Sequence, residues 1–211
     1  MKKNEILEKF KKYKQEFTLL EVKQIDNNYY FNDILIDDGT NYVWETDNFI
    51  VIKYGSRNSI SRILSNLYPM QFRFRHKKVN SIESVLQGIK YKNKKTQNLV
   101  FKYAGVDAYH TRASNLFDFW GNNGLLYWQG KQINRNEQEY QDFLDELYLS
   151  ALSNPLYFRA LISVNNKYLL HHIGRTNPHE TVLTRYEYES RLYALQRIAN
   201  DLKDKVKYKK M

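Results

Sequence analysis

The sequence predicts an α+β protein, in which a small N-terminal antiparallel β module precedes a mainly α-helical domain. Between residues 17 and 53, short runs of β-branched and aromatic residues are separated by clusters of Asp, Asn and Gly, which is the pattern of strands joined by tight turns. From residue 81 onward, apolar residues recur every three or four positions in several segments, as they do in amphipathic helices. The two patterns place the change of architecture near residue 50.

Length and composition limit the class of protein. A chain of 211 residues fits one domain with an appendage or two very small domains, and a hydrophobic fraction of 42% is enough to fill a core. The absence of cysteine excludes disulfide bonds, thiolate catalysis and cysteine-based metal sites. No apolar run approaches the roughly 18 residues of a membrane span, and the first ten residues are too charged for a secretory signal. We therefore expect a cytoplasmic protein that makes no membrane contact.

The chain is basic, with 33 Lys and Arg residues against 23 Asp and Glu residues and a formal charge of +10. Such an excess favours polyanionic partners, namely nucleic acid or nucleotide phosphates. The alternative is the codon usage of an AT-rich genome, which also fits the abundant Lys, Asn, Ile and Tyr. The 18 tyrosines suit either half-buried walls or surfaces on which bases stack.

Residues 1–49 are expected to form an appendage to the main domain. Apolar residues recur at every third or fourth position of residues 1–16, which predicts a short amphipathic helix. Short β-rich runs follow, and the Asp38-Gly39 pair is the strongest hairpin signal of the chain. The appendage is therefore a helix followed by an antiparallel meander.

Residues 50–202 are expected to form the main domain. Residues 93–98 interrupt its helical pattern, and residues 105–135 are irregular but rich in aromatic side chains and glycine, which is one way to build a ligand wall. The basic tail, residues 203–211, is expected to fray. The regular elements predicted for the domain are a hairpin through Phe72, Phe74 and Val79, helices over 81–90 and 137–152, a helix opened by Asn154-Pro155, a short strand or extended segment over 167–173, and a last helix opened by the capping box at 184–187.

A polar row accompanies the apolar face of the helix predicted over residues 81–90. Ser81 is expected to cap this helix. Glu83, Gln87 and Lys90 follow at positions i, i+4 and i+7, so a carboxylate, an amide and an ammonium group would project together from the margin of the core. The commonest meaning of such spacing is a solvated salt-bridge pattern on a helix surface, and this alternative stays open.

The usual signatures of catalysis and cofactor binding are absent from the sequence. It contains no P-loop, no dinucleotide-binding glycine pattern, no nucleophile elbow and no HExxH motif. His171 and His172 are adjacent, and neighbouring residues of a strand point to opposite faces, so a metal site built on both is not expected. A Ser/His nucleophilic pair stays open, although no serine is marked as activated. We expect no metal and no cofactor.

Two motifs resemble the NADAR family, also called YbiA-like. Members share a turn of the form Ser-Asn-(aromatic or apolar)-Tyr-Pro, followed by a helix with Glu, Gln and Lys at the spacing found here. Trp128 stands where the family has a tryptophan ahead of a long helix, and the resemblance covers roughly residues 50–200. The matching residues of the two motifs are Ser65, Asn66, Tyr68 and Pro69 in the turn and Glu83, Gln87 and Lys90 in the helix.

The resemblance implies a mainly helical catalytic domain that hydrolyses ribosyl N-glycosidic bonds. The substrates of the family are a ribosylamino-pyrimidine intermediate of riboflavin synthesis and ADP-ribose attached to guanine bases of nucleic acid. The sequence departs from the family pattern before its final helix, where residues 174–184 lack the family's Asp and Trp-Gly loop. Asn177 or Glu180 would take over the polar role there.

Roles follow for the residues of the two motifs. Glu83 would stabilise an oxocarbenium-like transition state or deprotonate the attacking water, as glycosidase carboxylates do. Lys90 would hold a phosphate or lower the pKa of Glu83, and Trp128 would stack on the base or exclude water. The alternatives are that Trp128 is a core residue, that Ser65 and Asn66 only cap a turn, and that Lys90 is a surface ion-pair partner.

The basic charge favours nucleic acid over a small molecule as the carrier of the substrate. The sequence therefore predicts a hydrolase that removes ADP-ribose from guanine in nucleic acid. A small-molecule N-glycosidase and a non-catalytic protein that binds nucleotides or nucleic acid are the two rivals. The sequence predicts no oligomeric state.

Overall fold

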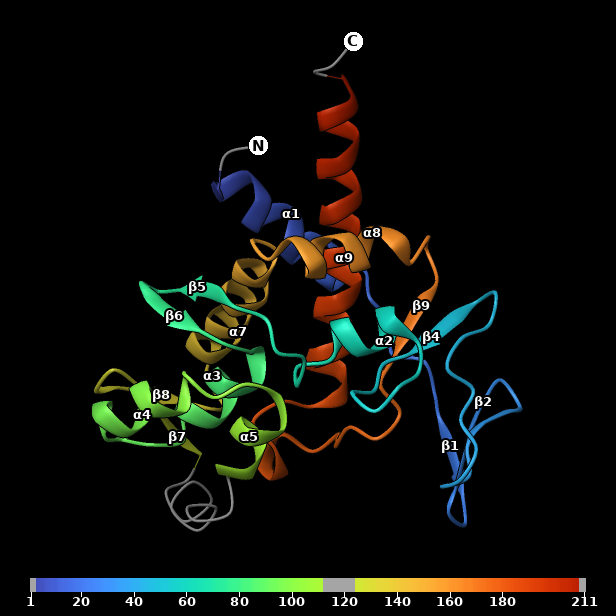
Figure 1. Ribbon diagram of the computed structural model, residues 1–211, viewed down its shortest axis with the longest axis horizontal. Helices are drawn as coiled ribbons and strands as arrows, with labels where there is room; N and C mark the ends of the chain where they lie inside the picture. Colours follow the sequence, from blue (N-terminus) through green and yellow to red (C-terminus); the bar gives the residue numbers. More distant parts are fainter. Residues whose placement is uncertain (1–2, 112–123, 209–211) are drawn as a thin grey trace. The chain divides into compact units, whose positions relative to one another are not determined.

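The structure, a computed structural model, describes residues 3–111 and 124–208 and confirms the α+β class predicted from the sequence (Figure 1). The chain forms two compact units, which are described separately. Unit 1 consists of Met1–Ser65, Arg159–Gly174 and Arg185–Met211, and unit 2 of Asn66–Phe158 and Arg175–Thr184. No described helix is long and apolar enough to cross a membrane.

Unit 1 contains the predicted N-terminal β module and the last helix of the chain. The strands β1, β2 and β3 form an antiparallel sheet in that order, as predicted. A positive φ at Asn32 and at Asp33 makes the tight turn between β2 and β3. The elements of unit 1 are α1 (Lys3–Gln15), β1 (Lys23–Ile25), β2 (Asn28–Phe31), β3 (Ile34–Asp37), β4 (Phe49–Val51), α2 (Ser59–Leu64), β9 (Tyr168–Leu170) and α9 (Arg185–Tyr208). Helix α8 (Pro155–Ser163) begins in unit 2 and ends in unit 1.

The predicted Asp38-Gly39 turn is present after β3. The Asp38 carboxylate accepts hydrogen bonds from the backbone N–H groups of Thr40 and Asn41, and Gly39 has a φ of +85°. An isolated antiparallel bridge joins Asp37 to Tyr42 across the turn. The chain then leaves the predicted meander, because β4 pairs in parallel with β9 rather than with β3.

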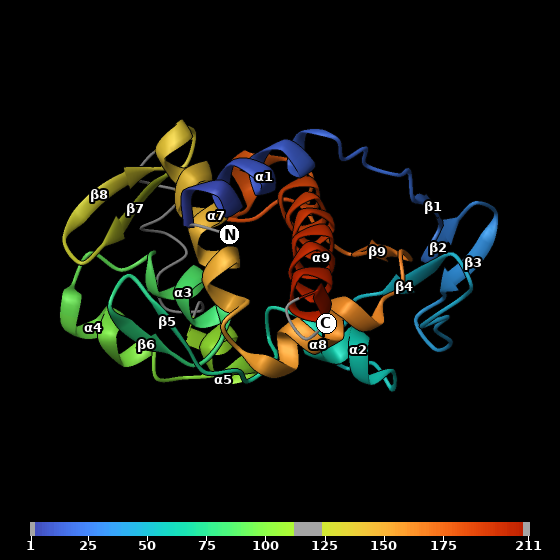
Figure 2. The same cartoon turned by 90° about the horizontal axis from the view of Figure 1, so that it is seen from above.

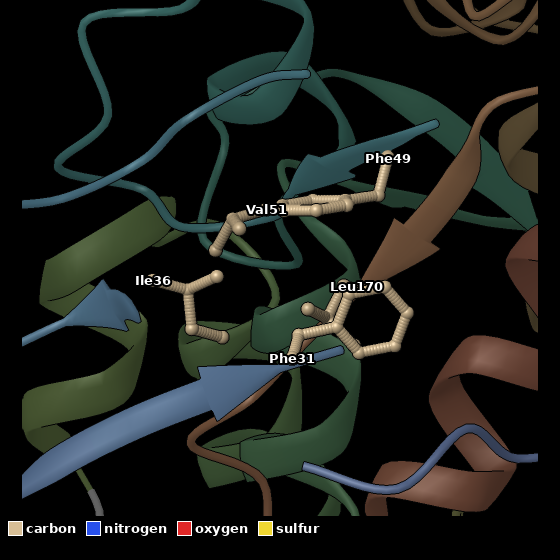
Figure 3. Close-up of a cluster of buried hydrophobic side chains, with 5 residues drawn as sticks. All are labelled: Phe31, Ile36, Phe49, Val51 and Leu170. Atoms are coloured by element: carbon tan, nitrogen blue, oxygen red, sulfur yellow. The ribbon is translucent and has the colours of Figure 1, made fainter. Parts of the chain in front are cut away.

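The parallel β4–β9 pair contributes to a buried apolar cluster in unit 1 (Figure 3). The five side chains of the cluster come from the N-terminal sheet, from β4 and from β9, and none is more than 3% exposed. Parallel pairing requires a long connection, and the register Ile50 to Leu169 joins strands that lie far apart in the sequence. The cluster consists of Phe31, Ile36, Phe49, Val51 and Leu170.

The N-terminal helix packs on the C-terminal helix within unit 1. Helix α1 lies beside α9 in both views (Figures 1 and 2), and Lys9 Nζ donates to Asp201 Oδ2 over 2.7 Å. Helix α9 extends through Tyr208, whereas residues 203–211 were predicted to fray. Residues 209–211 lie outside the described part of the chain. The predicted boundary after residue 49 does not separate the two compact units, because β4 belongs to unit 1 and pairs with β9.

Unit 2 combines two hairpins with short helices and the long helix α7. The hairpin predicted through residues 72–79 is present, and Arg75 and His76 form its turn with positive φ. Residues 93–98, predicted as an interruption, begin a helix that is capped by Asn93. The elements of unit 2 are β5 (Phe72–Phe74), β6 (Lys77–Val79), α3 (Ile82–Gly88), α4 (Lys94–Val100), α5 (Gly105–His110), β7 (Leu125–Trp128), β8 (Lys131–Asn134), α7 (Gln138–Ala151) and the 3-10 helix η2 (Pro178–Glu180).

The segment predicted to be irregular, residues 105–135, is partly regular. It contains α5 and the β7–β8 hairpin, whose strands pair antiparallel from Leu125 to Asn134. Residues 112–123 lie outside the described part, and with them three of the aromatic side chains that were expected to form a ligand wall. These three are Phe117, Phe119 and Trp120.

Candidate functional site

Helix α3 is the element around which the candidate site is built. Ser81 caps it as predicted, because its hydroxyl accepts a hydrogen bond of 3.0 Å from the backbone N–H of Ser84. The predicted apolar face is buried, with Ile82 and Val85 fully inaccessible. The polar side of the same helix is also buried, which the alternative of a solvated salt-bridge pattern does not allow.

Glu83, Gln87 and Lys90 form one hydrogen-bonded row. The side-chain amide of Gln87 donates to Oε1 of Glu83 over 2.6 Å, and Lys90 Nζ donates to Oε1 of Gln87 over 2.7 Å. Glu83 is 9% exposed and Gln87 is 4% exposed, whereas Lys90 is half-buried. Because Gln87 must donate on one side and accept on the other, its orientation is fixed, and it holds the carboxylate in one position.

The turn that contains Asn66 contacts the first turn of α3. The backbone N–H of Glu83 donates to the carbonyl oxygen of Asn66 over 3.0 Å. Oδ1 of Asn66 accepts a hydrogen bond of 2.8 Å from the hydroxyl of Tyr148 on α7. The structure therefore brings the central residues of the two sequence motifs together. Tyr148 was not predicted, and its only signal in the sequence was its place in an amphipathic helix.

Two further residues of the turn motif, Ser65 and Tyr68, are placed differently. Ser65 caps the C-terminus of α2 and belongs to unit 1, where its backbone N–H donates to the carbonyl of Arg62. Tyr68 is half-buried in unit 2. A role in substrate binding stays a prediction for Ser65, Asn66 and Tyr68.

Trp128 lies in an aromatic cluster of unit 2 and is 8% exposed. Its ring centroid is 4.9 Å from that of Phe74, 5.2 Å from that of Phe101 and 5.5 Å from that of Phe143. These contacts account for its burial by packing alone. The predicted stacking of Trp128 on a base stays a prediction.

Asn177 and Glu180 lie at the 3-10 helix η2, in an exposed part of unit 2. Asn177 Nδ2 donates to Glu180 Oε1 over 3.0 Å, and Arg175 pairs with Glu180 over 3.2 Å. A hollow of about 450 Å³ adjoins this segment. None of the described residues that line it belongs to α3 or to the polar row of Glu83, Gln87 and Lys90. Its lining consists of Gly124, Arg135, Asn136, Arg175, Pro178, His179 and Glu180.

His171 and His172 bind different groups of unit 1, as their adjacency in an extended segment suggested. His171 Nδ1 lies 3.0 Å from the carbonyl of Ile52, and His172 Nε2 lies 2.7 Å from Oδ2 of Asp37. Within residues 3–111 and 124–208, no group of three or more His, Asp and Glu side chains is arranged to hold a metal ion.

The fold and the site define an α+β protein in which a short helix carries a buried carboxylate and a buried amide, with a half-buried ammonium group just after the helix. Residues 58–197 match the sequence model of the family described as bacteriophage protein GP30.3. The match covers about two thirds of the chain, and the chain belongs to this family. No match was found among curated proteins or among solved structures.

The family match corrects the resemblance inferred from the sequence. The matching model is that of the phage GP30.3 family, and no NADAR model matches the chain. The residues that suggested NADAR form a short pattern of common residue types, whereas the family model matches residues 58–197. The roles expected for the site residues stay predictions, and the geometry of the site is the structural observation that bears on them.

Proposed function

We propose that the protein is a hydrolase of ribosyl N-glycosidic bonds and that Glu83 is its catalytic carboxylate. The observation that carries the proposal is the row in which Lys90 bonds Gln87 and Gln87 bonds Glu83. A buried carboxylate costs free energy unless it is hydrogen-bonded, and a surface ion pair would not require such a row. An oriented, water-poor carboxylate is what stabilisation of a developing positive charge requires.

The proposed chemistry needs only water as a second reactant. The bond between the ribose C1′ and the base nitrogen breaks, and positive charge develops on the ribose ring. Glu83 either faces this charge or accepts a proton from the water that adds to C1′. The departing base takes up a proton from solvent and Glu83 returns its proton to solvent, so that one water molecule is consumed in all. Gln87 orients Glu83, and Lys90 supplies a positive charge two hydrogen bonds away from the carboxylate.

The substrate that the composition favours is ADP-ribose attached to guanine in nucleic acid, because the chain carries a formal charge of +10. The small-molecule alternative is a ribosylamino-pyrimidine. We further propose that the reaction takes place in the cytoplasm, a reducing compartment with which a chain without cysteine is compatible.

The experiment that tests the proposal measures sugar release by chromatography. Purified protein is incubated with an oligonucleotide carrying ADP-ribosylated guanine and, separately, with a ribosylamino-pyrimidine. Glu83→Gln should lower turnover by on the order of 10²–10⁴, the loss expected for a positioned acid–base group. Ligand affinity should change little, because the charge acts in the transition state. Glu139→Gln is the matched control, since Glu139 belongs to the same unit and pairs with Lys131 at the surface.

A non-catalytic protein that binds nucleotides or nucleic acid is the second candidate. The dense packing around Trp128 favours it, because three rings already cover the side chain that was expected to contact a base. In this case the wild-type protein binds the oligonucleotide but releases no sugar from either substrate. Turnover that is unchanged in Glu83→Gln would refute the proposed mechanism.

A further inference from the structure

The segment from residue 71 to residue 103 is far more basic than the rest of unit 2. It carries nine Lys and Arg residues and a single acidic residue, Glu83, which is buried in α3. The exposed charges of this segment are therefore all positive. The nine basic residues are Arg73, Arg75, Lys77, Lys78, Lys90, Lys92, Lys94, Lys95 and Lys102.

Most of these cations have no acidic partner within the described part of the chain. Nε of Arg75 lies 2.7 Å from Oε2 of Glu146, and Nζ of Lys90 donates a hydrogen bond to Gln87. The other seven make no ion pair with a described residue, although ion pairs are common elsewhere in the structure. Unpaired like charges repel each other in the free protein, so a bound polyanion would relieve a repulsion as well as form new contacts.

Three of the unpaired lysines surround one hollow of about 480 Å³. Lys77 and Lys78 come from β6, and Lys102 follows α4. The remaining lining residues are the amides Gln71, Asn80 and Asn98 and the buried ring of Phe101.

Asn80 fixes the two sides of this hollow to each other. Its side-chain Nδ2 donates to the carbonyl of Lys102, and its backbone N–H donates to the carbonyl of Phe101 over 3.1 Å. Its Oδ1 accepts a hydrogen bond of 3.1 Å from the amide of Gln71. The β5–β6 hairpin and the end of α4 thus hold the lysines in a built concave surface rather than on independent loops.

We propose that this hollow, lined by Lys77, Lys78 and Lys102, binds the phosphodiester backbone of a nucleic acid. Lysines with Asn and Gln side chains are the usual donors to phosphate and sugar oxygens in such interfaces. The site goes beyond the proposed hydrolysis, because none of its lining residues belongs to the polar row of Glu83, Gln87 and Lys90. It binds nucleic acid whether or not the protein cleaves a glycosidic bond.

Fluorescence anisotropy with a labelled oligonucleotide tests the proposal. The variant Lys77→Gln/Lys78→Gln/Lys102→Gln is compared with Lys12→Gln/Lys23→Gln/Lys131→Gln, which removes the same formal charge from exposed positions of the chain. The first variant should bind about tenfold or more weakly at low salt, and its slope of log affinity against log salt should fall by about 2–3, since each duplex phosphate contact contributes about 0.9. The second should change affinity by less than about twofold.

Further measurements separate this site from the proposed hydrolysis, from diffuse attraction and from lipid binding. Glu83→Gln should keep the wild-type affinity for the oligonucleotide, so failure of the proposed hydrolysis leaves the binding result intact. Single-stranded DNA, single-stranded RNA and duplex DNA are measured in parallel to show which backbone is preferred. Equal losses in the two triple variants would show diffuse attraction and overturn the proposal. Binding of the wild-type protein to phosphatidylserine vesicles without binding to any oligonucleotide would overturn it as well.

Discussion

The imidazole Nε2 of His172 lies 2.7 Å from Oδ2 of Asp37 in unit 1, although 135 residues separate the two along the chain. Burial alone would raise the pKa of Asp37, but the backbone N–H of Gly39, His172 and Lys53 lower it below its usual value. Burial lowers the pKa of His172, and the hydrogen bond to Asp37 offsets only part of this effect. The pair therefore consists of a charged carboxylate and a neutral imidazole, which joins the N-terminal module to the segment after β9.

Unit 1 should lose stability in mild acid. Burial lowers the pKa of His171 to about 4, against 6.5 for an ordinary histidine, and lowers that of His172 as well. Below pH 6.5 the unfolded chain binds protons that the folded chain does not, so the free energy of unfolding falls as the pH decreases from about 6.5 toward 4. The lowered pKa of Asp37 extends the loss below pH 3.8. Urea unfolding followed at several pH values measures this dependence.

The control for the acid effect is a histidine on the surface. Replacement of the exposed His110 by Gln should leave the pH dependence unchanged, whereas His171→Gln should remove part of it. Glu189 acts in the opposite direction, because burial raises its pKa although Arg185 lowers it, and its protonation favours the folded state in acid. A pH dependence that is the same in the wild-type protein and in His171→Gln would contradict the neutral state of His171 in the folded protein.

Trp128→Ala should destabilise the protein strongly, because it removes the centre of an aromatic cluster that contains Phe74, Phe101 and Phe143. Large-to-small replacements of buried aromatic residues cost about 3–5 kcal/mol. Trp44→Ala is the control, because Trp44 is only half-buried, and it should lower the free energy of unfolding by less than Trp128→Ala does. Urea unfolding measures both. Trp128→Phe separates packing from binding, since a loss of ligand affinity without a loss of stability would establish the predicted contact with substrate.

Gly88→Ala should destabilise α3, because a Cβ atom at this position would lie 2.4 Å from Cε1 of the buried Phe101 ring. The ring must shift, and such overpacking costs about 1–3 kcal/mol. Gly55 is the matched control, because a Cβ atom there meets no atom within 4 Å. Gly55→Ala should be neutral or slightly stabilising. Thermal or urea unfolding of the two variants should therefore give results that differ clearly.

The parts of the fold that the sequence predicted correctly depend on local signals. The Ser81 cap of α3 and the Asn154-Pro155 start of α8 were predicted, and in the structure Oδ1 of Asn154 accepts a hydrogen bond of 3.0 Å from the N–H of Leu156. A cap satisfies donors within its own first turn, so a few adjacent residues suffice to predict it. The row of Glu83, Gln87 and Lys90 follows from helical spacing for the same reason.

The parts that the sequence did not predict depend on residues that are distant in the chain. The pairing of β4 with β9 and the bond between Tyr148 and Asn66 join segments 82 or more residues apart. Helix α4 was missed because its Lys- and Asn-rich sequence has no apolar period, and its stability comes from the Asn93 cap and from buried Gln97. The burial of Glu83 likewise results from packing around α3, and no pattern within the helix indicates it.

Replacement of Gln87 by Leu tests whether the amide positions Glu83 for chemistry or only fills the core. The change removes the 2.6 Å bond to Glu83 and the 2.7 Å bond from Lys90 while it keeps most of the volume. The loss of a hydrogen-bond partner by a buried polar group costs about 1–3 kcal/mol, so the free energy of unfolding should fall. Turnover should fall too, and the acidic limb of the pH–rate profile should move to higher pH, because the lost donor had favoured the charged carboxylate.

Gln97→Leu is the matched control for this last prediction. Gln97 is also a buried glutamine of unit 2, but its amide donates to the carbonyl oxygens of Tyr91 and Tyr127, each over 2.6 Å. Its replacement should lower stability by a similar amount and leave the pH–rate profile in place. Steady-state kinetics over pH, together with urea unfolding of both variants, decides between the two roles. A profile that moves equally in both variants, or in neither, would show that Gln87 is structural, because the amide of Gln87 bonds Glu83 whereas that of Gln97 bonds backbone carbonyl groups.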